Sequence, residues 1–258
     1  MFSLPNQPKV IKKEGSQTTF EIEGLYPGYG VTVGNSLRRV LFSSLEGWAI
    51  TQVKIKGVPH DFTTIPGVLE DVIMLTLNLK QLRFRVMGDE PQKAFLKVKG
   101  EREVKGSDFD LPSQMELMNK NAHIATLTKK ASELEMEVLV EKGIGYVSRD
   151  AQQKRKMEIG AISLDAIFSP VKRVTYKVEN MRVGERTDYD RLFIEVKTDG
   201  VISPEQAMSK AAQILVNHFS MIAETFKEEE KPVKEKKETV KKKKPVKKNE
   251  KKKKRKKI

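Results

Sequence analysis

The stretch Gly34-Asn35-Ser36-Leu37-Arg38-Arg39-Val40-Leu41-Phe42-Ser43-Ser44-Leu45 organises the rest of the chain. Its apolar positions recur at the spacing of one helix face. The members of this face are Leu37, Val40, Leu41, Ser44, Leu45 and Trp48. The side chain of Asn35 can accept a hydrogen bond from a first-turn amide, so we expect the helix to begin there. The sequence therefore predicts a helix from residue 35 that buries one face.

Arg38, Arg39 and Phe42 lie away from this apolar face. With about 100° between successive residues, Arg39 projects roughly opposite the face, and Phe42 lies about 60° from Arg39. One interpretation is a solvated basic surface that carries a stray aromatic ring. The other is a docking surface, because Arg and Phe are enriched at interfaces and an Arg pair can bind carboxylates. We favour the docking surface.

Positive charge is concentrated at one end of the chain. The 258 residues have a net charge of +14. Residues 227–258 contain 18 Lys or Arg and 6 Asp or Glu, a net of +12, which leaves +2 for the residues before them. We expect 229–258 to be disordered, because Lys, Glu and Pro cannot bury enough apolar surface to offset the ordering entropy. The remaining body is nearly neutral and does not indicate a surface that coats DNA.

Residues needed for several chemistries are missing. The chain has no Cys, which excludes disulfides, thiol catalysis and Cys-bound metals. The three histidines show no spacing typical of a metal or catalytic motif; they are His60, His123 and His218. We expect no catalytic residue, no metal and no cofactor. No apolar run approaches the roughly 20 residues of a membrane span, so we expect a soluble cytoplasmic protein without a membrane partner.

Glycine-rich and basic loops have simpler interpretations than ligand binding. Gly28, Gly30 and Gly34 precede the predicted helix, but their spacing matches no phosphate-binding loop, and a turn with positive φ is favoured. Residues 143–160 are polar and basic, and a flexible solvated loop is favoured there over a contact site.

Alternation of apolar and polar residues predicts short strands between the helices. The clearest alternations cover 19–25, 50–58, 82–86, 134–140, 174–178 and 192–196. A second helix is predicted over 66–80, with Glu70 and Asp71 adding negative charge to its first turn. These elements together predict an α+β fold.

A third helix is predicted over 204–226. Ser203 is its expected N-cap, Pro204 occupies the first turn, and Gln206 completes a capping box. The apolar stripe of this helix covers about half of the circumference, which is more than one sheet face needs. A core helix of a larger domain is one explanation, and a helix shared with a second subunit is the other.

Several segments resemble the bacterial DNA-directed RNA polymerase α subunit family. They are Gly-Asn-Ser-Leu-Arg-Arg-Val-Leu (34–41), Ser-Ser-Leu-Glu-Gly (43–47), the 57–72 segment, Asn-Leu-Lys (78–80), and Arg-Thr-Asp (186–188) followed by Thr-Asp-Gly (198–200). The resemblance spans about residues 1–226 in the order that the family has. One departure is Ser148, where family members usually carry Pro after the preceding Gly-Tyr-Val.

The resemblance implies an architecture and a set of partners. It implies a discontinuous dimerisation subdomain over 1–50 and 172–228, with two helices on an antiparallel sheet, and a mostly β insert over 51–171. It also implies a homodimer that scaffolds assembly of the large β and β′ subunits, with ω and σ joining through the complex. The nucleotidyltransferase activity would then belong to the complex and not to this chain.

The resemblance also assigns contact residues. Docking to the large subunits is expected from Arg38, Arg39, Phe42 and Lys80. The dimer interface is expected from the apolar stripes of the two helices, namely Leu37, Leu41, Leu45, Met208, Ala211, Leu215, Phe219 and Ile222.

The Lys-rich end departs from the family. Most bacterial α subunits carry a compact C-terminal domain that reads upstream DNA, and we expect that a Lys-rich tail replaces it here. The tail can neutralise phosphates without reading base edges. Its expected DNA contacts are Lys241, Lys242, Lys243, Lys244, Lys251, Lys252 and Arg255. A solubilising tail without a partner is the simpler alternative. A free-standing nucleic-acid-binding protein is the rival for the whole chain, but it gives Phe42 no role.

Overall fold

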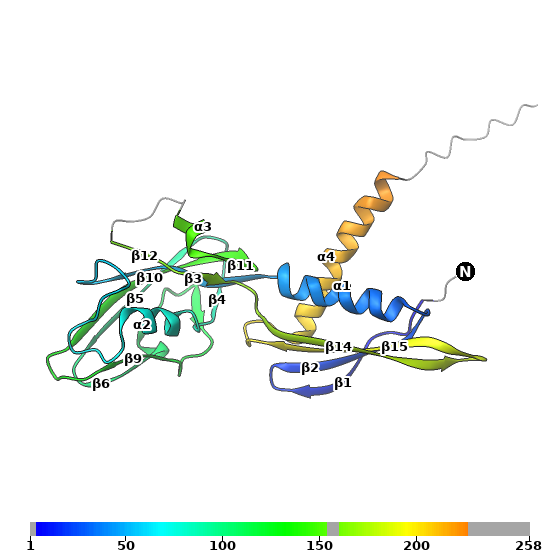
Figure 1. Ribbon diagram of the computed structural model, residues 1–258, viewed down its shortest axis with the longest axis horizontal. Coiled ribbons are helices and arrows are strands. Elements are labelled where there is room, and N and C mark those ends of the chain that lie inside the picture. Colours follow the sequence, from blue (N-terminus) through cyan, green and yellow to red (C-terminus); the bar gives the residue numbers. More distant parts are fainter. Residues whose placement is uncertain (1–3, 154–159, 227–258) are drawn as a thin grey trace, which may run out of the picture.

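The computed structural model describes residues 4–153 and 160–226 and arranges them as two lobes joined by a narrow waist (Figure 1). The fold is α+β and its named sheets are antiparallel, as the sequence predicts. Each lobe has its own apolar core. One core draws on residues between Phe20 and Leu45 and between Val171 and Leu215, and the other on residues between Ile50 and Leu164.

The first lobe is a four-stranded sheet with two helices. Its strand order is β1-β2-β15-β14. The strands are β1 (Lys9–Glu14), β2 (Gln17–Leu25), β14 (Val171–Val183) and β15 (Arg186–Thr198). The helices are α1 (Tyr29–Ser43) and α4 (Pro204–Thr225). Alternate residues of β15 point toward the helices and are fully buried, namely Leu192, Ile194 and Val196. This alternation explains why only one face of the sheet is covered.

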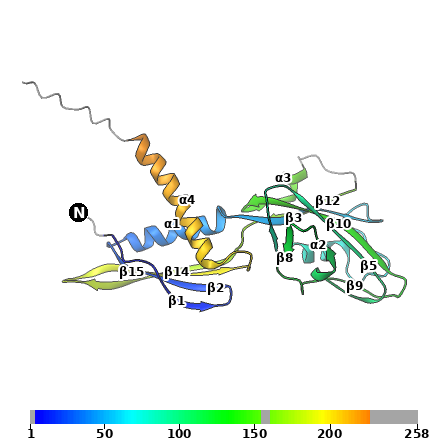
Figure 2. The ribbon, with the colours of Figure 1, turned by 180° about the vertical axis from the view of Figure 1, so that it is seen from behind.

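The second lobe is built on a five-stranded sheet of order β12-β3-β10-β5-β7. These strands are β3 (Glu46–Ile55), β5 (Gln92–Lys99), β7 (Phe109–Asp110), β10 (Glu133–Ile144) and β12 (Ile162–Ser163). Three two-stranded pairs complete it: β4 (Phe84–Val86) with β8 (Met115–Leu117), β6 (Arg102–Lys105) with β9 (His123–Leu127), and β11 (Tyr146–Val147) with β13 (Ala166–Ile167). Its helices are α2 (Val72–Leu79), the short α3 (Arg149–Gln153) and the 3₁₀ turn Gly106–Asp108. Figure 2 shows the same lobe from behind, with α2 beside β9.

The prediction that α1 begins at Asn35 is wrong. The helix begins at Tyr29, six residues earlier, and Gly28 occupies its cap position with φ 85° and no side-chain cap. Gly30 and Gly34 lie inside the helix rather than in a turn. A Cβ on Gly34 would come within 2.8 Å of Tyr176, so these glycines let the helix backbone lie close to the sheet. The helix also ends at Ser43, so Trp48 belongs to β3 and packs on the core of the second lobe.

The predicted helix over 66–80 is too long at its start. α2 begins at Val72, and Asp71 is the N-cap, whose side chain accepts a hydrogen bond from the Met74 amide at 2.7 Å. The residues before it are held by β9 instead, since Leu69 N donates to Thr126 O at 2.9 Å. Glu70 therefore precedes the helix and does not lie in its first turn.

The start of α4 is as predicted, and the 143–160 segment is not. Ser203 caps α4 and forms the capping box with Gln206. The predicted loop over 143–160 instead contains the end of β10, β11 and α3 in its described part. Residues 154–159 lie outside the described residues, as do the expected DNA contacts in the tail from Lys241 to Arg255.

Candidate interaction surfaces

The start of α1 is fixed by a carboxylate distant in sequence. The amides of Gly28 and Gly30 both donate to Asp190 Oδ2, each at 2.9 Å. Asp190 lies on β15 and is only 7% exposed. A negative group at a helix N-terminus satisfies free amides and interacts favourably with the helix dipole. This contact orients α1 on the sheet and therefore determines which of its side chains reach solvent.

The outward face of α1 combines two cations with an aromatic ring. Arg38 and Arg39 are exposed, and within residues 4–153 and 160–226 neither makes a hydrogen bond or ion pair through its side chain. Phe42 is 37% exposed on the same helix. We call Arg38, Arg39 and Phe42 the α1 surface. It offers unpaired guanidinium groups and apolar area, which suits a partner that carries carboxylates beside an apolar pocket.

Lys80, the fourth expected docking residue, is placed at a different site and is already paired. It caps the C-terminus of α2, and its Nζ lies 2.8 Å from Asp165 Oδ2. Asp165 also accepts a hydrogen bond from the Arg149 amide at 2.8 Å, and Arg149 pairs in turn with Asp61. The Lys80 ammonium and the Arg149 amide lower the pKa of Asp165, so this carboxylate stays ionised. Only 22% of the Lys80 side chain is exposed, so a partner would meet the Lys80–Asp165 pair and not a free cation.

Apolar side chains surround this pair on α2, and the sequence interpretation missed them. Ile73, Met74 and Leu77 are 40%, 51% and 45% exposed. Leu69, which precedes the helix, is 70% exposed. The buried positions of α2 are Val72, Leu75, Thr76 and Leu79. A small cavity of about 170 Å³ is lined in part by Ile73, Leu77 and the Lys80–Asp165 pair.

The apolar stripe of α4 is buried in the first half of the helix and exposed in the second half. Ala207 and Ala211 are fully buried on the core of the first lobe, and Met208, Ile214 and Leu215 pack against it in part. From Val216 onward every described residue of the helix is exposed. The large apolar members of this half are Val216, Phe219, Met221, Ile222 and Phe226, between 55% and 78% exposed. Figures 1 and 2 show this half rising clear of the sheet.

Most of the expected dimer-interface residues pack on the protomer's own core. Leu37, Leu41 and Leu45 belong to the protomer's own core and are at most 6% exposed. Ala211 is buried in the same core, while Met208 and Leu215 are partly covered by it. The cause is that α1 turns its apolar stripe onto β14 and β15 of the same chain. Of the eight expected residues, Phe219 and Ile222 keep a large exposed surface.

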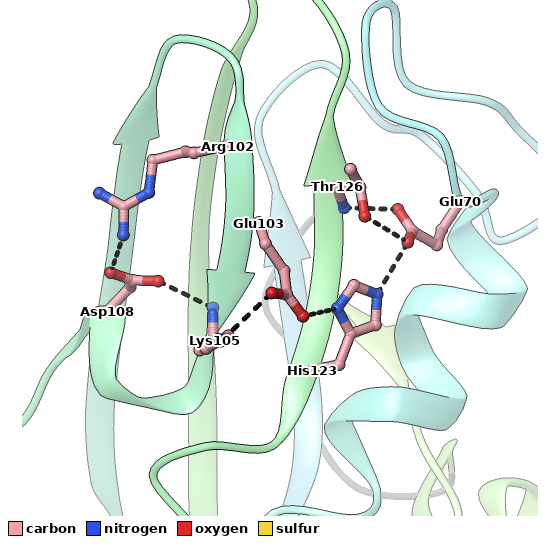
Figure 3. A network of polar contacts seen from close by, with 7 residues as sticks. All are labelled: Glu70, Arg102, Glu103, Lys105, Asp108, His123 and Thr126. Atoms are coloured by element: carbon pink, nitrogen blue, oxygen red, sulfur yellow. Dashed lines mark hydrogen bonds and ion pairs between the residues drawn. The ribbon is translucent and has the colours of Figure 1, made fainter.

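A polar network anchors the segment that leads into α2 (Figure 3). Glu70 accepts hydrogen bonds from Thr126 N at 2.7 Å and from Thr126 Oγ1 at 3.1 Å, and it lies 2.8 Å from His123 Nε2. Burial disfavours the Glu70 carboxylate, but the bonds from Thr126 and His123 outweigh it and lower its pKa. The network thus holds the residues just before α2 against β9.

The same network continues to β6. His123 Nδ1 lies 3.1 Å from Glu103, which pairs with Lys105 at 3.2 Å. The Lys105 amide donates to Asp108 at 2.8 Å, and Asp108 pairs with Arg102 (Figure 3). The carboxylate of Glu70, followed by that of Glu103, raises the pKa of His123 against the opposing effect of burial. These contacts fasten elements of one lobe to each other.

The described residues contain neither a metal-ligand group nor a membrane-spanning helix. Within 4–153 and 160–226, no group of three or more His, Asp or Glu side chains is arranged to hold a metal ion. None of the helices in the described part is long and apolar enough to cross a membrane.

Known proteins are similar to this chain over most of its length. Residues 53–169, most of the second lobe, match the family described as the RNA polymerase Rpb3/RpoA insert domain. The DNA-directed RNA polymerase subunit alpha of Syntrophomonas wolfei is 51% identical over 82% of this chain and 68% of that protein. The subunits of Symbiobacterium thermophilum and Porphyromonas gingivalis are 48% and 45% identical, over 67% and 68% of their own lengths.

The chain belongs to the DNA-directed RNA polymerase subunit alpha family. This membership makes it a subunit of a nucleotidyltransferase complex, and it disfavours a free-standing nucleic-acid-binding protein. Within the family, the matched insert corresponds to the lobe that carries α2 and Lys80.

Proposed function

We propose that this α subunit forms a homodimer and that the dimer scaffolds assembly of the large β and β′ subunits. The observation that carries the proposal is the exposed apolar half of α4, from Val216 to Phe226. An exposed row of Val, Phe, Met and Ile at one end of an isolated helix costs free energy in water, and a second copy can cover it. The dimerisation subdomain would comprise residues 1–50 and 172–228, and the insert 51–171.

Docking is proposed at two separate places on each protomer. Arg38, Arg39 and Phe42 would bind one large subunit through the α1 surface. Lys80 would contribute to another contact through its pair with Asp165, next to the exposed Ile73 and Leu77. The subunits ω and σ would join through the assembled enzyme, which we place in the cytoplasm. The proposed role is assembly rather than catalysis.

The dimer is tested by Phe219→Asp in the full chain. Because the Phe219 side chain is 61% exposed in the protomer, the substitution should leave each protomer folded. In a dimer it would bury a carboxylate against apolar groups, which costs several kcal/mol. We expect light scattering to show a dimer for the parent and a folded monomer for Phe219→Asp.

A matched control lies two residues away on the same helix. Asn217→Asp adds the same negative charge and keeps the oxygen that accepts from Gln213 Nε2 at 2.8 Å. It should remain dimeric. A Phe219→Asp variant that is still a dimer would refute the proposed interface, while Leu215→Asp is less informative because Leu215 also packs on the protomer's own core.

The Lys-rich segment beyond Phe226 is proposed to bind DNA backbones without sequence preference. Its 18 basic residues among 32 support phosphate neutralisation. The expected contacts from Lys241 to Arg255 lie outside the described residues, so this proposal rests on composition alone.

A further inference from the structure

One buried ion pair joins the two lobes at the waist. Arg83 follows α2 in the second lobe, and Asp199 follows β15 in the first. The Arg83 Nε and Asp199 Oδ2 atoms are 3.4 Å apart, and the side chains are 17% and 3% exposed. Burial lowers the pKa of Arg83 and raises that of Asp199, so both groups are largely withdrawn from water. The pair therefore lies in the junction and not on its rim.

Arg83 also binds the backbone at the end of α2. Its Nη1 donates to Lys80 O at 2.8 Å and to Leu82 O at 2.9 Å. A planar guanidinium can satisfy several acceptors at fixed angles, which a lysine ammonium cannot reproduce. One side chain thus connects the carbonyl of Lys80 to the carboxylate of Asp199.

Asp199 organises the turn that leads into α4. Its Oδ1 accepts from the Val201 amide at 3.0 Å, and its own amide donates to Pro170 O at 2.9 Å. Arg85, two residues beyond Arg83, donates through Nη2 to Val201 O at 2.8 Å. Both arginines therefore hold the same turn, and Ser203, the N-cap of α4, follows only two residues later.

Other arginine pairs lie within one lobe, and their arginines are more exposed. Arg102 pairs with Asp108 within the second lobe, and Arg173 pairs with Glu195 across β14 and β15 of the first. Arg83–Asp199 differs because its partners come from two cores. A buried ion pair adds little net stability over an apolar pair, but it can select one relative arrangement of the parts it joins.

We propose that Arg83 is a positioning residue that fixes the Lys80 end of α2 relative to the start of α4. The docking site on the insert and the dimerisation helix would then be held at one angle, so that the two lobes meet their partners as a single rigid body. This inference rests on the proposed function, because it assumes that Lys80 contacts a large subunit. Without the link, the bond from Arg85 Nη2 to Val201 O would remain as a second polar contact across the waist.

The orientation of the lobes can be measured directly. Since the chain has no Cys, two can be introduced at exposed lysines, Lys99→Cys on β5 and Lys177→Cys on β14, and spin-labelled. Labelled full-length chain is mixed with an excess of unlabelled chain, so that distances within one protomer dominate. The parent should give one narrow distance distribution.

Three variants separate orientation from folding. Arg83→Lys keeps the charge and loses the planar donor fork. The combined Arg83→Met and Asp199→Asn variant removes both charges and leaves no unpaired ion, while the introduced amide oxygen would still accept from the Val201 amide. Arg102→Lys makes the same change at a pair inside one lobe. We expect broader or split distributions for the first two variants, unchanged circular dichroism for all three, and a parent-like distribution for Arg102→Lys.

Capture of the large subunits completes the test. Coupling effects of this kind alter affinity by about two- to thirtyfold, and we expect weaker capture by both Arg83 variants within this range. Parent-like distances or parent-like capture in the Arg83 variants would overturn the inference. Unchanged capture by Lys80→Ala would instead overturn the docking role of Lys80, so the two failures are distinguishable.

Discussion

Replacing Asp190 with Ala should loosen α1 from the sheet and destabilise the first lobe. Asp190 Oδ2 accepts from the amides of Gly28 and Gly30, and no residue near Gly28 in sequence provides a side-chain cap. The Gly30 amide is buried, so losing its acceptor should cost about 1–3 kcal/mol. The Gly28 amide can turn to water, with a cost of about 0.5–1.5 kcal/mol. Loss of the negative charge at the helix N-terminus adds about 0.3–1 kcal/mol.

The expected destabilisation is therefore about 2–5 kcal/mol for Asp190→Ala. Asp190→Asn keeps an oxygen that can accept both bonds and loses mainly the charge, so it should cost about 1 kcal/mol. Asp188→Ala is the matched control, because Asp188 lies on the same strand and pairs with the exposed Arg186 instead. It should stay close to the parent.

Urea unfolding at one fixed protein concentration gives these free energies, since dimerisation makes the apparent stability concentration-dependent. Asp190→Ala should lower the free energy of unfolding most, Asp190→Asn less, and the control Asp188→Ala least. If Asp190→Ala unfolds like the parent, or if Asn is as damaging as Ala, the carboxylate does not cap α1 and this explanation of the helix start is incorrect.

Three further predictions concern the α1 surface, the His123 network and the Lys-rich tail. Arg39→Ala should keep the fold and the dimer but weaken capture of a large subunit by about 2–5 kcal/mol if the partner carboxylate is buried. The control Arg182→Ala, at the exposed end of β14, should leave capture unchanged. Equal capture by both variants would contradict docking through the α1 surface. The pKa of His123 is raised by Glu70, so the stability that His123 adds should be full below about pH 6.5 and decline as the pH rises through the raised value. The difference in urea midpoint between the parent and His123→Gln should therefore shrink between about pH 6 and pH 9, and a constant difference would argue against the charged pair. When the chain is cut after Phe226, the polymerase should still assemble, but its promoter affinity should depend less steeply on salt concentration. The change should be equal for AT-rich and GC-rich upstream DNA. An unchanged slope of affinity against salt would contradict a DNA role for the tail.

A rigid waist between the lobes would have a specific role in the proposed assembly. The proposed dimer contact lies at the far end of α4, and Lys80 lies in the other lobe at the end of α2. If the lobes could rotate freely, the two contacts would have to be aligned during each binding event, at an entropic cost. A rigid waist removes that cost in advance, which is what the Arg83–Asp199 link and the Arg85 bond would provide.

The start of α4 and the α+β class could be read from the sequence because their signals are local. Ser203, Pro204 and Gln206 lie within four residues of each other, and a capping box needs no other part of the chain. The alternation along β10 and β15 likewise depends only on the two-residue repeat of a strand. The exposure of Phe219 and Ile222 was implied by the wide stripe of α4, although the sequence did not show where the protomer's own core would end.

The beginnings of α1 and α2, the pairing of Lys80 and the link at the waist were decided by tertiary structure. Asn35 is a good cap by type, yet α1 begins at Tyr29 because Asp190, 160 residues away from Gly30, supplies the acceptor. Leu37, Leu41 and Leu45 were expected at an interface and instead cover the chain's own sheet. Lys80 meets Asp165 only once the second lobe has folded, and Arg83 meets Asp199 only after two cores have formed and been placed together. Periodicity and capping act within a few residues, whereas a carboxylate or a sheet face that is distant in sequence acts only once folding has brought it near.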